Sequence, residues 1–348
     1  MRGRLRIQSA VFVAAISCVL VDRPAVHAQA GYLSLVRGYI DGKTNAAFEM
    51  ANLPRAAIDA GLRACLAQER GGRPSCRPHE LRSAAILHAD AIDFLVKHDA
   101  SQASFHAQAG ARLLRPIEKL DAEFVSRWYA YVARIYLANN DPVMARSLVA
   151  DGLSRFDAPD LYLARGLISE RQALRNVSDI LGAMLDHHLN EGTTTNTLRL
   201  AIADYLQALS IAPGHTGARL RLTWIRLLQR DGRAVEDATG ILRTSTDPEA
   251  RYLSLLFRGA ITERDRSPAE AIHDYDDARR EDVDTQTACV ALSHAQGVAG
   301  ELSRSAAVAV ECLARDTGNG DMDPWWPFHA GLMDLTTTKW LHDRAVQP

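Results

Sequence analysis

The residues best suited to chemistry in this chain are histidines that stand beside carboxylates. The sequence Asp186-His187-His188 is followed three residues later by Glu191. Imidazole and carboxylate groups bind zinc and copper, so a metal site is one interpretation. Adjacent side chains on a helix point about 100° apart, however, and a second element would be needed to bring both histidines to one ion. The HExxH spacing of zinc enzymes is missing, and we expect a polar helix end with no metal.

Three further histidines with nearby carboxylates occur in the first third of the chain, at His79–Glu80, His88–Asp90 and His98–Asp99. Such neighbours could serve general acid–base catalysis. His88 follows an apolar run, where a hydrogen-bonded core histidine is the alternative. GxSxG, phosphate-binding glycine loops and CxxC do not occur after residue 30. We therefore expect no catalysis and no cofactor, with a hydrolase built on the N-terminal half as the alternative.

The cysteines after residue 30 fall into two pairs. Cys65 and Cys76 flank a loop with two glycines and a proline, whereas Cys289 and Cys312 lie nearly symmetrically about Gly300, where a hairpin turn is expected. An oxidising compartment would allow both pairs to form disulfides, each stabilising the fold by roughly 3 kcal/mol. Free buried cysteines are the alternative, and neither pair has zinc-site spacing. We predict the disulfides Cys65–Cys76 and Cys289–Cys312.

The first thirty residues have the pattern of a secretory signal peptide. Three arginines (Arg2, Arg4 and Arg6) precede the apolar segment 7–21, and Ala28-Gln29-Ala30 offers a cleavage site. The apolar segment is short for a membrane span, which needs roughly 20 residues. We predict export to the periplasm or cell envelope, with no stable membrane span after cleavage. A lipoprotein attached through Cys18 is a weaker alternative, because apolar residues continue beyond it.

Loss of residues 1–30 would remove four arginines and one aspartate, which changes the formal net charge from −2 to −5. An acidic chain without a basic cluster gives little basis for binding a phosphate backbone. We therefore expect no nucleic acid among the partners.

Helices must position these groups, because the composition and the hydrophobic pattern both favour them. Hydrophobic residues make up 47% of the chain and aromatic residues 6%, with alanine and leucine dominant. After Gly31 there is no sustained alternation of period two, and helical segments alternate with short breakers.

One stretch organises the helical pattern. Ala201, Tyr205 and Ala208 share a helix face, and Pro213 ends the helix. The small–large–small stripe recurs at Ala145–Val149–Gly152, Ala271–Tyr275–Ala278 and Ala306–Val310–Leu313. The copies at Ala271 and Ala306 are 35 residues apart, and a recurrence near 34–35 residues is typical of stacked helical hairpins.

The clearest single unit is 126–159. Its first helix carries Tyr129, Val132, Ala133 and Tyr136, a turn follows at 139–142, and the second helix carries the stripe. This order resembles a tetratricopeptide repeat (TPR), and the resemblance extends over 126–315 and more loosely over 31–125. It implies an all-α, right-handed superhelical solenoid of helix–turn–helix units.

The expected organisation has four parts. They are a signal peptide at 1–30, degenerate helical hairpins at 31–125, TPR-like repeats at 126–317 with an insert at 175–197, and a C-terminal cap at 318–348. For the cap, Asp323 is the expected N-cap, and Trp325, Phe328, Leu332 and Leu335 form a stripe that would cover the 285–315 hairpin. The alternative is that Trp325 and Trp326 form an exposed anchor for a partner.

The resemblance also implies a binding surface, since the first helices of TPR units line the concave side. Leu220, Trp224 and Leu227 would point there, together with Arg127 and Arg134. Such a face could bind an extended peptide or a partner helix, although Trp224 could instead fill space between repeats. We predict a non-catalytic exported scaffold that binds another protein or peptide. A homo-oligomeric structural subunit and the hydrolase are the alternatives.

Overall fold

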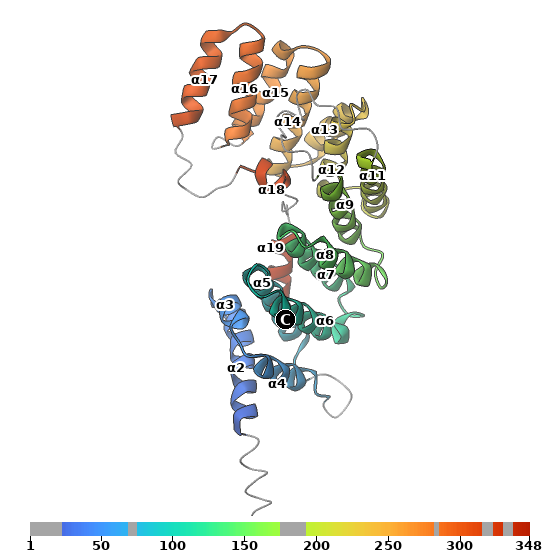
Figure 1. Ribbon diagram of the computed structural model, residues 1–348, viewed down its shortest axis with the longest axis vertical. Coiled ribbons are helices and arrows are strands. Elements are labelled where there is room, and N and C mark those ends of the chain that lie inside the picture. Colours follow the sequence, from blue (N-terminus) through green and yellow to red (C-terminus); the bar gives the residue numbers. More distant parts are fainter. Residues whose placement is uncertain (1–22, 69–74, 175–192, 282–284, 315–322, 330–336) are drawn as a thin grey trace, which may run out of the picture. The chain divides into compact units, whose positions relative to one another are not determined.

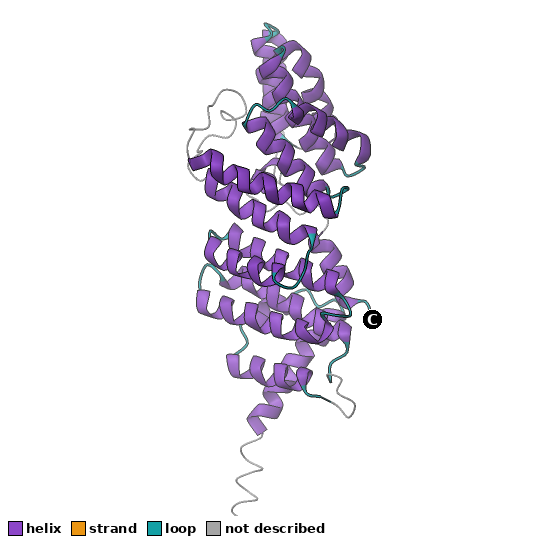
Figure 2. Cartoon of the chain, turned by 90° about the vertical axis from the view of Figure 1, so that its right-hand side faces the viewer, coloured by secondary structure: helices purple, strands orange, loops and turns teal. Residues whose placement is uncertain are grey.

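The computed structural model describes residues 23–68, 75–174, 193–281, 285–314, 323–329 and 337–348. These ranges contain seventeen α-helices, one short 3-10 helix and no β-strand (Figure 2). The prediction of an all-α fold of helical repeats is confirmed. No helix in the same ranges has the length and apolar character to cross a membrane. The predicted signal peptide lies mostly outside the described residues, and its expected cleavage site falls near the start of the first helix.

The chain folds as two compact units. Unit 1 comprises Met1–Trp128 together with Thr338–Pro348, and unit 2 comprises Tyr129–Thr337. The helix α7 (Ala122–Ala138) contributes its first turns to unit 1 and the remainder to unit 2.

Unit 1 is built around one buried helix. Its elements are α2 (Arg23–Ile40), α3 (Ala46–Ala51), α4 (Arg55–Leu66), α5 (Pro78–Leu95), α6 (Ala100–Leu114), η1 (Arg115–Ile117), the start of α7, and α19 (Thr337–Val346) (Figure 1). The helix α5 packs against α2, α3 and α6, and residues 81–89 are buried without interruption. A helix that is buried on all sides lies in the interior of a fold, and α5 is therefore the centre of unit 1.

The C-terminal helix α19 completes unit 1. The hydroxyl of Ser83 in α5 donates to the Ala345 carbonyl (2.9 Å), and Nε of Arg344 donates to Asp121 (3.0 Å). Leu341 of α19 is fully buried. The expectation that residues 318–348 act together as a cap on the last hairpin is therefore corrected, since their final helix belongs to the N-terminal unit.

Unit 2 is a series of antiparallel hairpins. After α7 it contains α8 (Pro142–Leu153), α9 (Pro159–Leu174), α11 (Thr193–Ile211), α12 (Thr216–Leu228), α13 (Arg233–Thr244), α14 (Pro248–Asp265), α15 (Pro268–Glu281), α16 (Gln286–Val298), α17 (Leu302–Ala314) and α18 (Trp325–His329). The helices pair as α9 with α11, α12 with α13, α14 with α15 and α16 with α17 (Figure 1). Thr193–Asn196, predicted as a loop of the insert, instead begin α11, and residues 175–192 lie outside the described ranges.

Local sequence explains where the hairpins turn. In the predicted turn at 139–142, Asn140 adopts the left-handed conformation (φ 61°), which asparagine tolerates better than most residues. Asp141 caps α8 by accepting from the Met144 amide (3.0 Å), and Pro142 is the first residue of the helix.

The predicted stripes are buried where two helices approach closely. Tyr205 of α11 covers Gly166 of α9, and Tyr275 of α15 covers Gly259 of α14. A Cβ at either glycine would lie 2.4 or 2.5 Å from the tyrosine ring. Each tyrosine hydroxyl donates to the glutamate four residues after its glycine, Glu170 (2.6 Å) and Glu263 (2.8 Å). A Gly-x3-Glu pair on one helix thus holds a tyrosine of the next.

The stripe predicted to include Ala306 and Val310 does not lie on a buried side of its helix. Ala306 and Val310 of α17 are exposed, Val310 at 67%, whereas Cys312 on another side of that helix is buried. The hydroxyl of Ser305 donates to the Ser293 carbonyl (2.8 Å) and so turns its own side of α17 toward α16. Small residues occur on both sides of α17, so their spacing did not identify the packed side.

Candidate binding site

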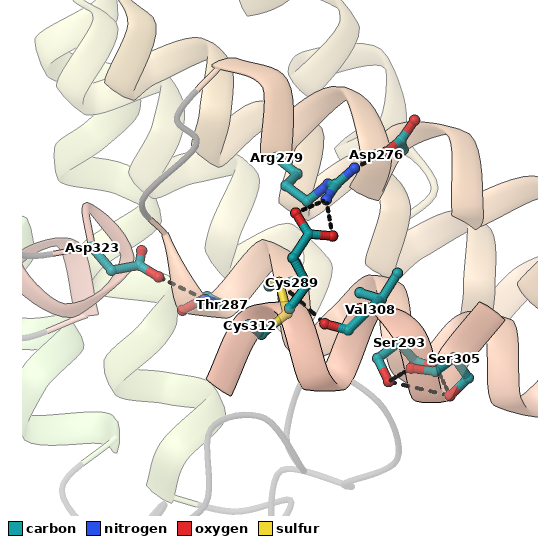
Figure 3. Close-up of a disulfide and its surroundings, with 10 residues drawn as sticks. Asp276, Arg279, Thr287, Cys289, Ser293, Ser305, Val308, Cys312 and Asp323 are labelled. Atoms are coloured by element: carbon teal, nitrogen blue, oxygen red, sulfur yellow. Dashed lines mark hydrogen bonds and ion pairs between the residues drawn. A yellow bond between two sulfur atoms is a disulfide. The ribbon is translucent and has the colours of Figure 1, made fainter. Parts of the chain in front are cut away.

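Both predicted disulfides are present. Cys65–Cys76 lies in unit 1 with a Cα–Cα distance of 4.6 Å, and Cys289–Cys312 joins α16 to α17 with a Cα–Cα distance of 6.0 Å (Figure 3). The predicted pairing is confirmed.

The carboxylates next to the candidate histidines have structural roles. Glu80 accepts from the Arg77 amide at the start of α5 (2.8 Å), and Asp99 accepts from the Gln102 amide at the start of α6 (2.8 Å). Asp90 contacts His342 of α19 (3.0 Å). No three potential metal ligands converge in the described parts of the chain, and 186–191 lie outside them.

His88 has a different partner from the one its sequence suggests. Its Nδ1 lies 2.8 Å from Nδ1 of His106, and its Nε2 lies 3.2 Å from the Tyr32 hydroxyl. Burial lowers the pKa of both histidines, that of His106 to about 4 with a further contribution from Arg55. Two neutral rings can share one proton in a hydrogen bond, and the pair therefore joins α5 to α6 inside unit 1.

The five residues predicted to line a concave face are divided between the two units. Arg127 lies in unit 1, where it pairs with Glu123 (2.9 Å) and stacks 4.2 Å from the ring centroid of Trp340. Arg134, Leu220 and Leu227 are buried in unit 2. Trp224 is buried as well, and it is the member of this set that enters an aromatic cluster.

A segment from near the end of the chain covers Trp224. Residues 323–329, which we call the tail segment, contain α18 and contact α12, α14 and the start of α16. Trp325 meets Trp224 edge to face with ring centroids 5.2 Å apart, and Phe328 lies 5.4 Å from Phe257 of α14. Trp224 and Phe257 are themselves 5.8 Å apart. Aromatic contacts of this kind contribute about 0.5–1.5 kcal/mol each beyond the area they bury.

Arg221 of α12 binds the other end of the tail segment. Its guanidinium lies 3.7 Å from the Phe328 ring centroid and donates a hydrogen bond to the Phe328 carbonyl. A buried ion pair with Glu170 (3.1 Å) holds the guanidinium in place, and Glu170 also accepts from Tyr205. The same glutamate thus links the repeat contact to the tail contact.

Asp323 anchors the start of the tail segment. Its carboxylate accepts from the Tyr252 hydroxyl (3.0 Å), the Thr287 amide (2.7 Å, Figure 3) and the Trp325 amide (2.9 Å). These donors satisfy a buried carboxylate, and the amide end of a helix favours a negative charge. We call the surface formed by Arg221, Trp224, Tyr252, Phe257 and Thr287 the tail-binding face.

Trp325 and Phe328 are buried, as the stripe predicted for the cap requires. They pack on α12 and α14, however, and not on the 285–315 hairpin that the cap was expected to cover. Trp326 is 50% exposed, and the apolar residues Val290, Val298, Leu302 and Val310 are exposed on α16 and α17. Leu332 and Leu335 lie outside the described residues. Spacing showed that one side of the segment is buried, but it carried no signal for which helices bury it.

Comparison with known proteins does not identify a family for this chain. No protein-family model matches the chain, and no curated protein matches it. Among solved structures the chain is similar to the human IFIT1 dimer with m7Gppp-AAAA, with a TM-score of 0.43 and 15% sequence identity. The match covers 78% of this chain and 62% of that chain. Similarity at this level carries no functional assignment.

One expectation is corrected on physical grounds. We predicted no nucleic acid among the partners because the chain is acidic. Net charge is an average over the molecule and does not describe the potential at one face of a helical array. The exclusion of nucleic acid is therefore withdrawn.

Proposed function

We propose that this protein is a non-catalytic helical-repeat scaffold that binds a peptide segment of another protein on the tail-binding face. One observation carries the proposal, namely that this face already binds a peptide segment, residues 323–329 of the same chain. The contacts combine aromatic packing, capture of a main-chain carbonyl and capture of a carboxylate. Grooves that recognise peptides use the same three kinds of contact.

The environment of the titratable groups supports a binding role. Burial raises the pKa of Tyr205 and Tyr275, and their hydrogen-bonded glutamates raise it further. The shifted pKa values of His88 and His106 arise mainly from burial inside unit 1. These shifts accompany contacts that hold helices together, and they need no catalytic role as explanation.

Export is part of the proposal. Two disulfides fit an oxidising compartment such as the periplasm. Tyr32, which is buried against Gly61 and His88, would remain in the chain after cleavage at Ala28 or Ala30. Amino-terminal sequencing of the protein from its native host should begin at Gln29 or Gly31. A start at Met1 would contradict export, and a lipidated Cys18 would support the lipoprotein.

A photo-crosslinking residue at the exposed Gln286, next to Thr287 of the tail-binding face, tests the binding role. In the native host, a foreign protein crosslinked there in stoichiometric amount is expected. A matched crosslinker at Gly240 of α13, distant in sequence from the tail segment, is the control. The proposal fails if both positions give the same products.

A second candidate function is that of a homo-oligomeric subunit. The exposed apolar residues Val290, Val298, Leu302 and Val310 of the last hairpin favour it, since an interface would bury such side chains. Analytical ultracentrifugation of the wild type and of Val310→Asp distinguishes this candidate. A dimer that dissociates in the variant would support it, whereas a monomer in both would exclude it.

A further inference from the structure

The tail-binding face has three subsites at fixed spacing. The first accepts a carboxylate, because the Tyr252 hydroxyl and the Thr287 amide both donate to Asp323. A cationic side chain is not needed there, since two neutral donors and the amide end of α16 provide the positive potential. An apolar or basic residue in this subsite would leave both buried donors without an acceptor.

The second and third subsites accept aromatic rings. Trp325 stacks against Phe328 (6.1 Å) and packs edge to face with Trp224 and Phe257. Phe328 is fixed by Arg221, which contacts both its ring and its carbonyl. The required pattern is therefore Asp-x-Trp-x-x-Phe, with the spacing set by one turn of helix.

The tail segment cannot hold this structure by itself. A helix of five residues such as α18 is far below the length that is stable alone in water, so contacts with the face must order it. Binding is assisted by the tether, which gives a linked segment an effective concentration of about 1 mM. The tail segment thus contacts the tail-binding face as a covalently linked peptide ligand would.

We infer that the tail segment is an internal competitor for the protein's partner. The partner presents an acidic–aromatic segment of the form Asp-x-Trp-x-x-Phe and displaces residues 323–329 from the tail-binding face. This inference rests on the proposed function and identifies the chemistry of the peptide. A face with an intrinsic Kd of about 10 µM would bind the free peptide about 100-fold more weakly while the tethered tail competes at about 1 mM.

The test measures binding of a fluorescein-labelled peptide with the sequence DPWWPFH by anisotropy. The full-length release variant Trp325→Ala/Phe328→Ala keeps the face but removes both rings of the competitor. It should bind the peptide about 100-fold more tightly than wild type does. Trp326→Ala, which alters a half-exposed ring, should bind like wild type, and the peptide DPAWPAH should bind neither protein.

Two further variants keep the inference falsifiable if the release variant does not fold. Asp323→Ala leaves the aromatic cluster intact, and it should bind the peptide about tenfold more tightly than wild type. Adding Tyr252→Phe to Asp323→Ala should reverse that gain, because the face then lacks a donor for the peptide carboxylate. Natively folded variants that show no peptide binding up to 1 mM would overturn the inference.

The result also separates this inference from the proposed function. If the crosslinker at Gln286 captures a partner but the released face binds no DPWWPFH, the scaffold role stands and the proposed peptide chemistry is wrong. If the peptide binds the released face but no partner is captured in the host, the peptide chemistry stands and the scaffold role is wrong.

Discussion

Units 1 and 2 are both helical and each contains one disulfide, but different contacts hold them together. In unit 2 each helix packs mainly on the next one along the chain, and the Gly166–Tyr205 and Gly259–Tyr275 contacts repeat. Unit 1 is closed by α19, whose residues lie more than 200 positions from their partners Ser83 and Asp121. Repetition of sequence therefore reports neighbours along the chain, and it says nothing about a segment that returns from the other end.

The tail segment extends this contrast into unit 2. It also returns to helices that precede it by 70 or more residues, with Tyr252 and Trp224 as partners. Both returning segments bring polar groups into buried positions. We therefore expect the loss of stability to differ between variants that break a contact of a returning segment and variants that break a contact between neighbouring helices.

The largest effect is expected from removal of the helix that closes unit 1. Truncation after Thr338 exposes the surface that covers Leu341 and leaves Ser83 without its acceptor. Loss of one buried leucine costs about 2–5 kcal/mol, and a buried group without a partner costs about 1–3 kcal/mol. We expect unit 1 to lose about 5 kcal/mol, measured by hydrogen exchange of α5 amides, while α14 amides keep their protection. Lys339→Ala, which removes an exposed ion pair with Asp343, should change little.

The next largest effect is expected at a repeat contact in unit 2. A Cβ at Gly259 would lie 2.5 Å from the Tyr275 ring, so Gly259→Ala forces α14 and α15 apart. Overpacking of this kind costs about 1–3 kcal/mol, and the rigid ring places this site at the upper end. Gly240→Ala is the matched control, because nothing lies within 4 Å of its Cβ. That change should stabilise helix α13 by about 0.5–1 kcal/mol, so denaturation should show shifts of opposite sign.

A smaller effect is expected at an alanine of the same stripe. Ala271 of α15 is fully buried, whereas Glu270 beside it is exposed. Ala271→Leu should destabilise unit 2 by about 2 kcal/mol, and Glu270→Leu should be nearly neutral. Equal shifts in melting temperature for the two variants would mean that the register of the repeats is wrong.

Sequence predicted the features that depend on neighbours along the chain. The helical class, the stripes at Tyr205 and Tyr275 and both disulfides follow from spacing within a hairpin. The partners of Trp325, Leu341 and His88 could not be predicted, because a periodic pattern shows that a side is buried without showing what buries it. Val310 was predicted to be buried and is exposed, because α17 has small residues on more than one side and their spacing does not identify the buried one.

The smallest effect concerns the buried histidines of unit 1 and depends on pH. The pKa of His106 is lowered to about 4 by burial and by Arg55, below the value of about 6.5 in an unfolded chain. The unfolded state therefore binds more protons between these values, and unit 1 loses stability as pH falls from 6.5 toward 4. His106→Asn keeps a hydrogen-bonding group near Nδ1 of His88 and removes this titration. We expect the loss between pH 7 and 5.5, measured by urea denaturation, to shrink by about 1 kcal/mol in this variant.

His342→Asn provides a control of opposite sign in the same unit. Burial lowers the pKa of His342, but its hydrogen bond with Asp90 and the charge of that carboxylate raise the pKa by more, and the net shift is upward. A group with a raised pKa stabilises the fold at pH values below its pKa in the unfolded chain. This contribution is lost as pH rises through its pKa in the folded protein. His342→Asn should therefore destabilise unit 1 more at pH 5.5 than at pH 7. If both variants changed the pH dependence in the same direction, the paired rings of His88 and His106 would not be neutral in the folded protein.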